Sequence, residues 1–173
     1  MKKMLSILFM TAVAGSVFAQ QSALKPITGV NLDRNTKLPV HWLIQGQPAD
    51  KATVKTIVDQ NGKSKSITFA PVKSRLDFFG NAMTFEKGDE FTIKVKIKGT
   101  GKVALAYMGY RTDNKFLFSS TSKPIVLTGE VQELTQKFVV KDGKDYPTAK
   151  IRTAIRMDKG TVCEITDFTL TEE

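Results

Sequence analysis

The chain has 173 residues, and its 26 lysines and arginines against 17 acidic residues give a formal net charge of +9 at pH 7. This length fits a single domain with a substantial core. The one cysteine, Cys163, excludes an intramolecular disulfide, so packing must hold the fold together.

The first 19 residues have the pattern of a secretory signal peptide. Met1-Lys2-Lys3 is a basic start, residues 5–13 are apolar, and small residues precede the expected cleavage after Ala19. We expect a flexible lead over residues 20–27 and one folded domain over residues 28–173. No segment approaches the roughly 20 apolar residues that a membrane-spanning helix needs. The mature protein is therefore expected to be secreted or periplasmic, without membrane insertion.

The middle of the chain predicts a long strand with one dry face. Residues 40–46, 53–59 and 65–69 are strand-like, and residues 76–85 form an aromatic segment. In residues 91–98, four large apolar side chains alternate with threonine and lysine, which predicts a core strand with a basic outer face. Residues 98–102 are glycine-rich and predict a tight turn, so residues 89–111 are expected to form a long β-hairpin.

The last third of the chain predicts further strands and one irregularity. Cys163 and Ile165 share one parity, whereas Phe168 and Leu170 share the other. A regular strand cannot bury all four, so we predict a β-bulge near Thr166-Asp167 that turns Asp167 aside. No segment has a sustained helical period, and the whole pattern predicts an all-β fold, an antiparallel sandwich or barrel.

The sequence offers no recognisable catalytic constellation. His41 is the only histidine, no serine lies in a Gly-x-Ser-x-Gly elbow, and no spacing pairs two carboxylates. Gly99-Thr100-Gly101 lies between two strands rather than before a helix, unlike a phosphate-binding loop. We therefore expect no enzymatic activity.

Two groups of side chains are candidates for binding. The first is a basic group on two predicted strands, able to hold anionic groups if those strands are neighbours; an ordinary solvated sheet face is the favoured alternative. It comprises Lys94, Lys96, Lys98, Arg152 and Arg156. The second is an aromatic group whose exposed rings would stack on sugar rings. It comprises Trp42, Tyr107, Tyr110, Phe116, Phe118 and Tyr146.

Parity divides the aromatic group. Tyr107 shares its parity with Val103 and Leu105 and is expected in the core, whereas Tyr110 and Tyr146 lie near loops and are expected to be exposed. The predicted ligand-binding residues are Trp42, Lys94, Lys96, Tyr110, Arg111, Tyr146, Arg152 and Arg156.

Five short motifs follow one another in the order seen in a known family. They are Val30-Asn31-Leu32-Asp33, Leu38-Pro39 with Trp42, residues 65–69, Lys87-Gly88-Asp89-Glu90-Phe91-Thr92-Ile93, and Glu164-Ile165-Thr166-Asp167-Phe168-Thr169-Leu170. The chain resembles the jelly-roll carbohydrate-binding modules of bacterial cellulases and xylanases, within the galactose-binding-like superfamily. The resemblance implies an antiparallel jelly-roll sandwich that binds glycans on a sheet face or loop rim. It also implies a structural calcium ion, with Asp33 and Asp167 at the matching positions.

The expected function is thus that of an exported, non-catalytic protein that binds polysaccharide or glycan. Two alternatives stay open: a structural or protein-interaction component of the cell envelope without a sugar site, and an anion-binding protein that uses the lysine-rich sheet face. No nucleic-acid partner is expected.

Overall fold

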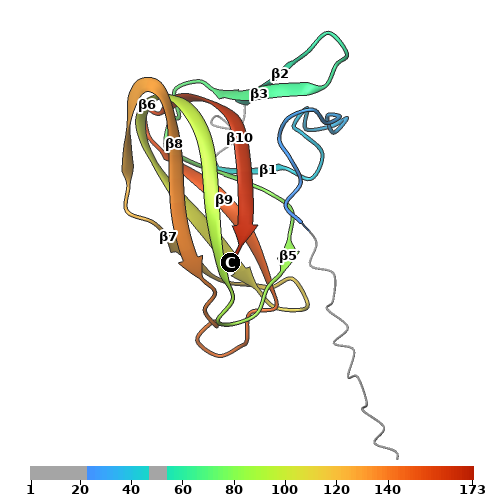
Figure 1. Cartoon of the computed structure of the whole chain (residues 1–173), viewed down its shortest axis with the longest axis vertical. Helices are drawn as coiled ribbons and strands as arrows, with labels where there is room; N and C mark the ends of the chain where they lie inside the picture. Colours follow the sequence, from blue (N-terminus) through green and yellow to red (C-terminus); the bar gives the residue numbers. More distant parts are fainter. Residues whose placement is uncertain (1–22, 47–53) are drawn as a thin grey trace, which may run out of the picture.

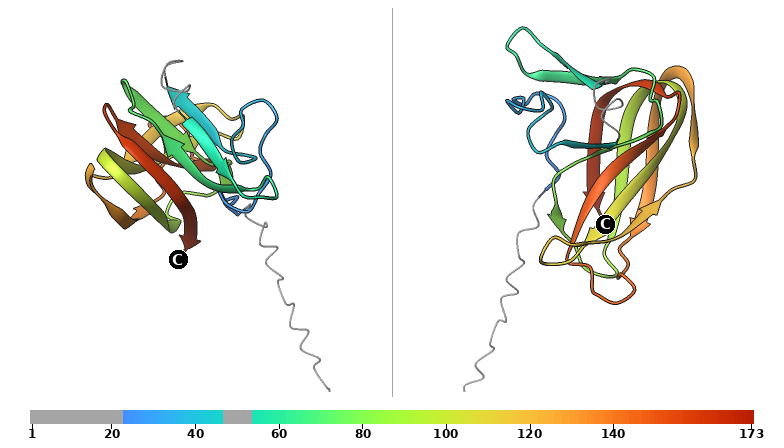
Figure 2. Two further views of the ribbon diagram at one scale, coloured as in Figure 1. Left: turned by 90° about the horizontal axis from the view of Figure 1, so that it is seen from above. Right: turned by 180° about the vertical axis from the view of Figure 1, so that it is seen from behind.

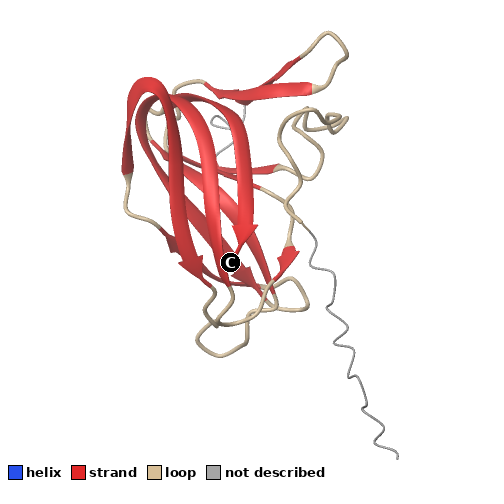
Figure 3. Cartoon of the chain, in the orientation of Figure 1, coloured by secondary structure: helices blue, strands red, loops and turns tan. Residues whose placement is uncertain are grey.

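The computed structural model describes residues 23–46 and 54–173, and within these ranges all regular structure is β-strand (Figure 3). The predicted signal peptide lies outside these ranges and stays a prediction. No helix that is long and apolar enough to cross a membrane occurs in the described part of the chain.

The described residues form ten strands joined in one continuous sheet, and every strand pairing is antiparallel. The strands are β1 (Leu43–Gly46), β2 (Val54–Val58), β3 (Ser64–Phe69), β4 (Arg75–Phe79), β5 (Met83–Thr84), β6 (Glu90–Tyr110), β7 (Phe116–Thr121), β8 (Ile125–Val139), β9 (Lys150–Asp158) and β10 (Val162–Glu172).

The sheet folds over on itself because β6 and β8 bend together (Figure 1). The first half of β6 pairs with β10 and the second half with β9, so one strand belongs to two layers. The first layer contains β2, β3, β10, residues 90–98 of β6 and residues 131–139 of β8. The second layer contains β1, β4, β9, residues 103–110 of β6, and β7, with the short β5 beside β9 (Figure 2).

The predicted hairpin over residues 89–111 is wrong, because β6 runs through the glycine-rich segment without reversing. A β-carbon at Gly101 would lie 2.6 Å from Cα of Thr161, and φ is +107° there, a conformation that suits glycine. Opposite the bend, the β8 register shifts where β8 carries Gly129. The glycines therefore turn a strand from one layer into the other, a use that local sequence does not distinguish from a turn.

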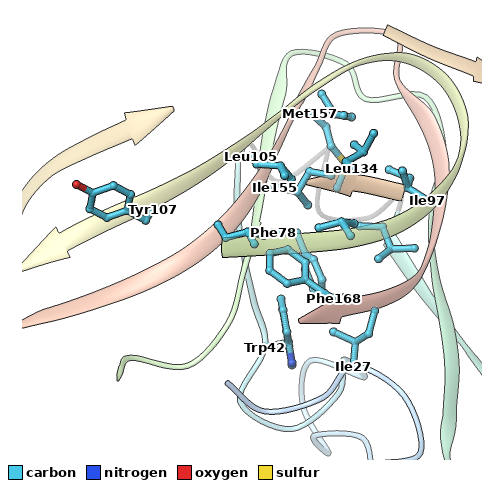
Figure 4. Packing of buried hydrophobic residues seen from close by; sticks show 14 of the residues in the cluster. Ile27, Trp42, Phe78, Ile97, Leu105, Tyr107, Leu134, Ile155, Met157 and Phe168 are labelled. Carbon is cyan, nitrogen blue, oxygen red and sulfur yellow. The ribbon is translucent and has the colours of Figure 1, made fainter. Parts of the chain in front are cut away.

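The dry face of β6 lies in the core, as its alternation predicts. Phe91, Ile93, Val95 and Ile97 are all at most 1% exposed. Phe91 from the first half of β6 packs edge-on against Tyr107 from the second half, with ring centroids 5.5 Å apart. The two halves of one strand thus face each other across the sandwich, in the core shown in Figure 4.

The predicted β-bulge in β10 is confirmed. The pairing register with β6 shifts between Ile165 and Asp167, so Thr166 is the extra residue. Cys163, Ile165 and Phe168 are consequently all buried, while Asp167 is exposed.

The described end of the expected flexible lead is held against the core instead. Ile27 is fully buried, and Leu24 packs against the same cluster. The indole Nε1 of Trp42 donates a hydrogen bond to the Lys25 carbonyl at 2.9 Å. The polar composition of residues 20–27 predicted a flexible segment, but the packing of Leu24 and Ile27 against the core fixes residues 23–27.

Candidate functional site

The outer face of the second layer carries a small, mostly buried group of apolar side chains that is separate from the main core. Alternation sends Phe78, Tyr107 and Ile155 inward. Their neighbours point outward and form a second apolar cluster of Phe79, Ala106, Met108 and Ala154, against which Tyr110 packs. Together with Leu43, Asp77, Phe116, Arg152 and Arg156, these residues define what we call the aromatic face.

Two rings and one aliphatic side chain reach the solvent on this face. Phe116 is 58% exposed and meets Tyr110 edge-on, with ring centroids 5.9 Å apart. Leu43 is 40% exposed and lies opposite Phe79 in the pairing of β1 with β4. Burial raises the pKa of the Tyr110 phenol, and the nearby charge of Arg152 opposes that rise. The face therefore offers neutral aromatic surface.

Arg152 has its guanidinium over two rings of this face. Its guanidinium carbon lies 5.6 Å from the ring centroid of Phe79 and 5.9 Å from that of Tyr110, within the range of a cation–π contact. Its Nη1 donates a hydrogen bond to the carbonyl of Gly80 at 3.3 Å. These contacts hold the guanidinium beside the rings.

Arg156 lies on the same face of β9, four residues after Arg152, and is instead paired with a buried carboxylate. Its Nε donates to Asp77 Oδ1 at 2.8 Å and its Nη2 donates to Asp77 Oδ2 at 3.0 Å. The hydrogen bonds to Asp77 raise the pKa of Arg156. The Asp77 side chain is only 7% exposed, so the ion pair of Asp77 and Arg156 is a largely buried polar part of the aromatic face.

A pocket of about 700 Å³ adjoins the aromatic face at the start of β1. Arg152, Leu43, His41 and Asn81 are among its lining residues. His41 is exposed and has a positive φ of 75°, which turns the chain into β1. The polar side chains of the pocket thus border apolar surface, an arrangement typical of ligand sites.

Tyr146 and Arg111 lie together at the end of β6. The Arg111 guanidinium carbon is 4.1 Å from the Tyr146 ring centroid, and Tyr146 is 50% exposed, as expected. The Ala149 amide donates a hydrogen bond to the Tyr110 carbonyl at 3.0 Å, which ties this loop to β6. Arg111 also pairs with Asp113 at 3.3 Å. This pair is a second aromatic feature beside the aromatic face.

Trp42 is unavailable to a ligand, contrary to its place among the predicted binding residues. It is 1% exposed and stacks on Phe78 with ring centroids 4.6 Å apart. The ring fills the core, and its one polar atom is bound to the Lys25 carbonyl. Trp42 lies among apolar residues in the sequence (Val40, Leu43 and Ile44), and this pattern indicated that its ring would be buried.

The lysines of β6 do not join the arginines of β9. Lys94 and Lys96 lie in the first layer, whereas Arg152 and Arg156 lie in the second, because β9 pairs with β6 only beyond the bend. Lys96 stands between Glu133 and Asp167 in the pairing register. Cross-strand acids therefore flank Lys96, whereas the cross-strand neighbours of Lys94 are Thr135 and Thr169.

The calcium prediction finds little support in the side chains. Asp33 Oδ1 already accepts hydrogen bonds from the Thr36 amide, the Thr36 hydroxyl and the Asn35 amide, which lower the pKa of the Asp33 carboxyl. Asp167 lies opposite Lys96. In residues 23–46 and 54–173, no three histidine, cysteine or acidic side chains are grouped so as to hold a metal ion. Calcium needs six to eight oxygens, which can include backbone carbonyls, and calcium binding at Asp33 and Asp167 stays a prediction.

Sequence reasoning missed Phe79 and Leu43. Phe78 and Phe79 are adjacent in a strand, so one ring had to point away from the core, and this parity was a usable signal. Leu43 gave no such signal, because an apolar residue beside Trp42 is equally consistent with burial.

Comparisons with known proteins place the fold. No protein-family model and no curated protein matches the sequence. Among solved structures, a CBM4 carbohydrate-binding module is 18% identical with a TM-score of 0.51, covering 86% of this chain and 95% of that one. The CBM22-1–GH10 modules of Clostridium thermocellum endo-1,4-β-D-xylanase 10B, solved with xylohexaose, are 16% identical with a TM-score of 0.55, covering 88% and 29%.

A third similar structure is the enzymatically active domain of bacteriophage CBA120 tailspike protein 4, with 14% identity and a TM-score of 0.55. The match covers 78% of this chain but 20% of the tailspike, so the chain spans only a fraction of that protein and of the xylanase. At these identities the likeness concerns the fold. The chain has the antiparallel jelly-roll fold of carbohydrate-binding modules, which confirms the fold and the resemblance predicted from the sequence.

Proposed function

We propose that this protein is exported and binds polysaccharide, without cleaving it, through the aromatic face. The observation that carries the proposal is the exposure of Phe116 and Leu43, which are 58% and 40% exposed, beside Tyr110 on the outside of a sheet whose inside is already packed. Apolar surface that a fold does not need marks an interaction site. Sugar rings have apolar faces that stack on aromatic rings, and their hydroxyls bond to neighbouring polar groups.

The proposal agrees with three of the predicted residues and with the similar structures. Tyr110, Arg152 and Arg156, which the sequence analysis nominated separately, lie on this one face. Two of the similar structures contain carbohydrate-binding modules, one of them solved with a xylose hexamer. Export rests on the signal-peptide pattern of residues 1–19.

Affinity electrophoresis through gels that contain soluble polysaccharides tests this function. We expect retardation in at least one gel, and Phe116→Ala should weaken binding by roughly three- to tenfold through loss of ring stacking. Val131→Ala is the matched control, because Val131 is 57% exposed on the first layer. The function is refuted if no neutral or acidic glycan retards the wild-type protein.

One observation favours the envelope-interaction alternative as a second candidate. Among the described strands, β8 pairs with β6 alone, and it carries Val126 and Val131, which are 62% and 57% exposed. An edge strand with exposed apolar residues can add a strand from a partner. Val126→Lys should then abolish a crosslinked complex in exported fractions, and a wild-type protein that crosslinks to nothing would exclude this candidate.

A further inference from the structure

The cations beside Tyr110 on the aromatic face are Arg152 and Lys150. Lys150 lies opposite Tyr110 in the pairing of β9 with β6 and donates hydrogen bonds to the Thr112 carbonyl and to Asn114 Oδ1. Arg156 is neutralised by Asp77, and Arg111 at the rim pairs with Asp113. In the described part of the chain, Arg152 makes no ion pair with a carboxylate. The Arg152 guanidinium therefore lies next to the buried ring of Phe79 and the half-buried ring of Tyr110, and the described residues show no carboxylate paired with it.

The Arg152 guanidinium is also held in place before any ligand arrives. It lies over Phe79 and Tyr110 and donates one hydrogen bond to the Gly80 carbonyl. A guanidinium has five N–H donors, so the contact with Gly80 leaves donors for a ligand. A planar donor group fixed in this way binds carboxylate or sulfate oxygens at little entropic cost.

The adjoining pocket can accommodate an acidic substituent. Its polar lining includes His41, whose ring can donate a hydrogen bond, whereas the Asn81 amide already donates to the Ala23 and Ala82 carbonyls. Asp33 is the carboxylate among the described lining residues, and its Oδ1 is already bound by the Thr36 and Asn35 groups of its own turn. Arg152 also lines the pocket, and apart from its hydrogen bond to the Gly80 carbonyl it has no carboxylate partner among the described residues.

We propose that the aromatic face selects acidic glycans, whose sugar ring stacks on Phe116 and Tyr110 while its carboxylate or sulfate binds Arg152. This inference rests on the proposed polysaccharide function and adds the substrate class. The formal net charge also acts in this direction by attracting a polyanion from a distance; it is +9 for the full sequence and +7 once the predicted signal peptide with Lys2 and Lys3 is removed.

Matched polymer pairs provide the test. Polygalacturonate is compared with its methyl-esterified form, and dextran sulfate with dextran, so that backbone and linkage stay constant while the charge changes. The assays are run at physiological salt, which screens the diffuse attraction of distant charges. The wild-type protein should prefer an acidic member by about tenfold or more, the range of a charge-assisted hydrogen-bonded pair.

Three variants distinguish binding at Arg152 from attraction by the overall positive charge of the protein. Arg152→Gln should lose the acidic preference, and Arg152→Lys should keep part of it, because the charge remains while the planar donor group is lost. Lys94→Gln removes the same charge from the first layer and should keep the preference. Thermal melts identify any variant that fails to fold, and Arg152→Lys still tests the proposal if Arg152→Gln is unfolded.

These experiments give different results if the acidic preference is wrong and if the proposed polysaccharide function is wrong. Equal binding of charged and neutral members, with loss of binding in Phe116→Ala, overturns the acidic preference and leaves the proposed function standing. Equal losses in Arg152→Gln and Lys94→Gln also overturn it, because diffuse charge would then explain the binding. No binding to any polymer overturns both.

Discussion

Removing the Asp77 carboxylate should destabilise the protein through the arginine that it leaves behind. Asp77 is 5% exposed, and both of its oxygens accept hydrogen bonds from Arg156, at 2.8 and 3.0 Å. In Asp77→Ala the guanidinium loses this partner while β9 still holds it over the sheet. The loss of one member of a buried pair costs about 3–5 kcal/mol, and we expect the lower end, about 3, because the Arg156 side chain is 20% exposed.

The expected cost converts into a measurable shift. For a domain of this size, about 3 kcal/mol lowers the melting temperature by roughly 6–12 °C. Thermal unfolding followed by circular dichroism, with urea titrations to obtain the free energy of unfolding, measures it directly. Lys96→Ala serves as a control for removing an exposed charge in the first layer, and it should shift the melting temperature little.

A double variant isolates the cause. Asp77→Leu combined with Arg156→Met removes both charges and should recover most of the stability that Asp77→Leu alone loses. The reasoning is refuted if Asp77→Ala costs less than about 1 kcal/mol, or if the effects of the two single substitutions add up in the double variant.

Two further predictions concern the bend and the core. Gly101→Ala should destabilise more than Gly129→Ala by roughly 1–3 kcal/mol in urea titrations, because only the β-carbon at 101 meets the Thr161 backbone; equal losses would mean that the positive φ alone matters. Burial raises the pKa of the Cys163 thiol from 9.0 to about 12, so a thiol reagent should label it only after unfolding. Since the unfolded thiol ionises first, this contribution to stability is present below pH 9.0 and lost as the pH rises towards about 12. Cys163→Ala should reduce that alkaline loss in thermal melts, and an unchanged slope would count against the burial argument.

Parity predicted the parts of the fold that depend on neighbours in the sequence. The buried side of β6 and the bulge at Thr166 both follow from which side chains alternate, and the structure confirms both. The glycine-rich segment after Lys98 could not be interpreted in the same way, since glycine permits a turn and a bend equally well. What distinguishes them is the pairing of β8 along both halves of β6, a contact between segments far apart in the chain.

The candidate site likewise depends partly on local sequence pattern and partly on contacts between distant segments. The sequence alone identified a β-sandwich, its core strand and several side chains suited to glycans, among them Tyr110, Arg152 and Arg156. It could not determine that these three share a face while Lys94 belongs to the other layer, because the bend decides which strand lies beside which. Nor could it show that Asp77 pairs with Arg156, while the described part of the chain shows no ion pair for Arg152. Alternation along a strand is a local property, whereas strand neighbours and charge partners arise only when the sheet folds over on itself.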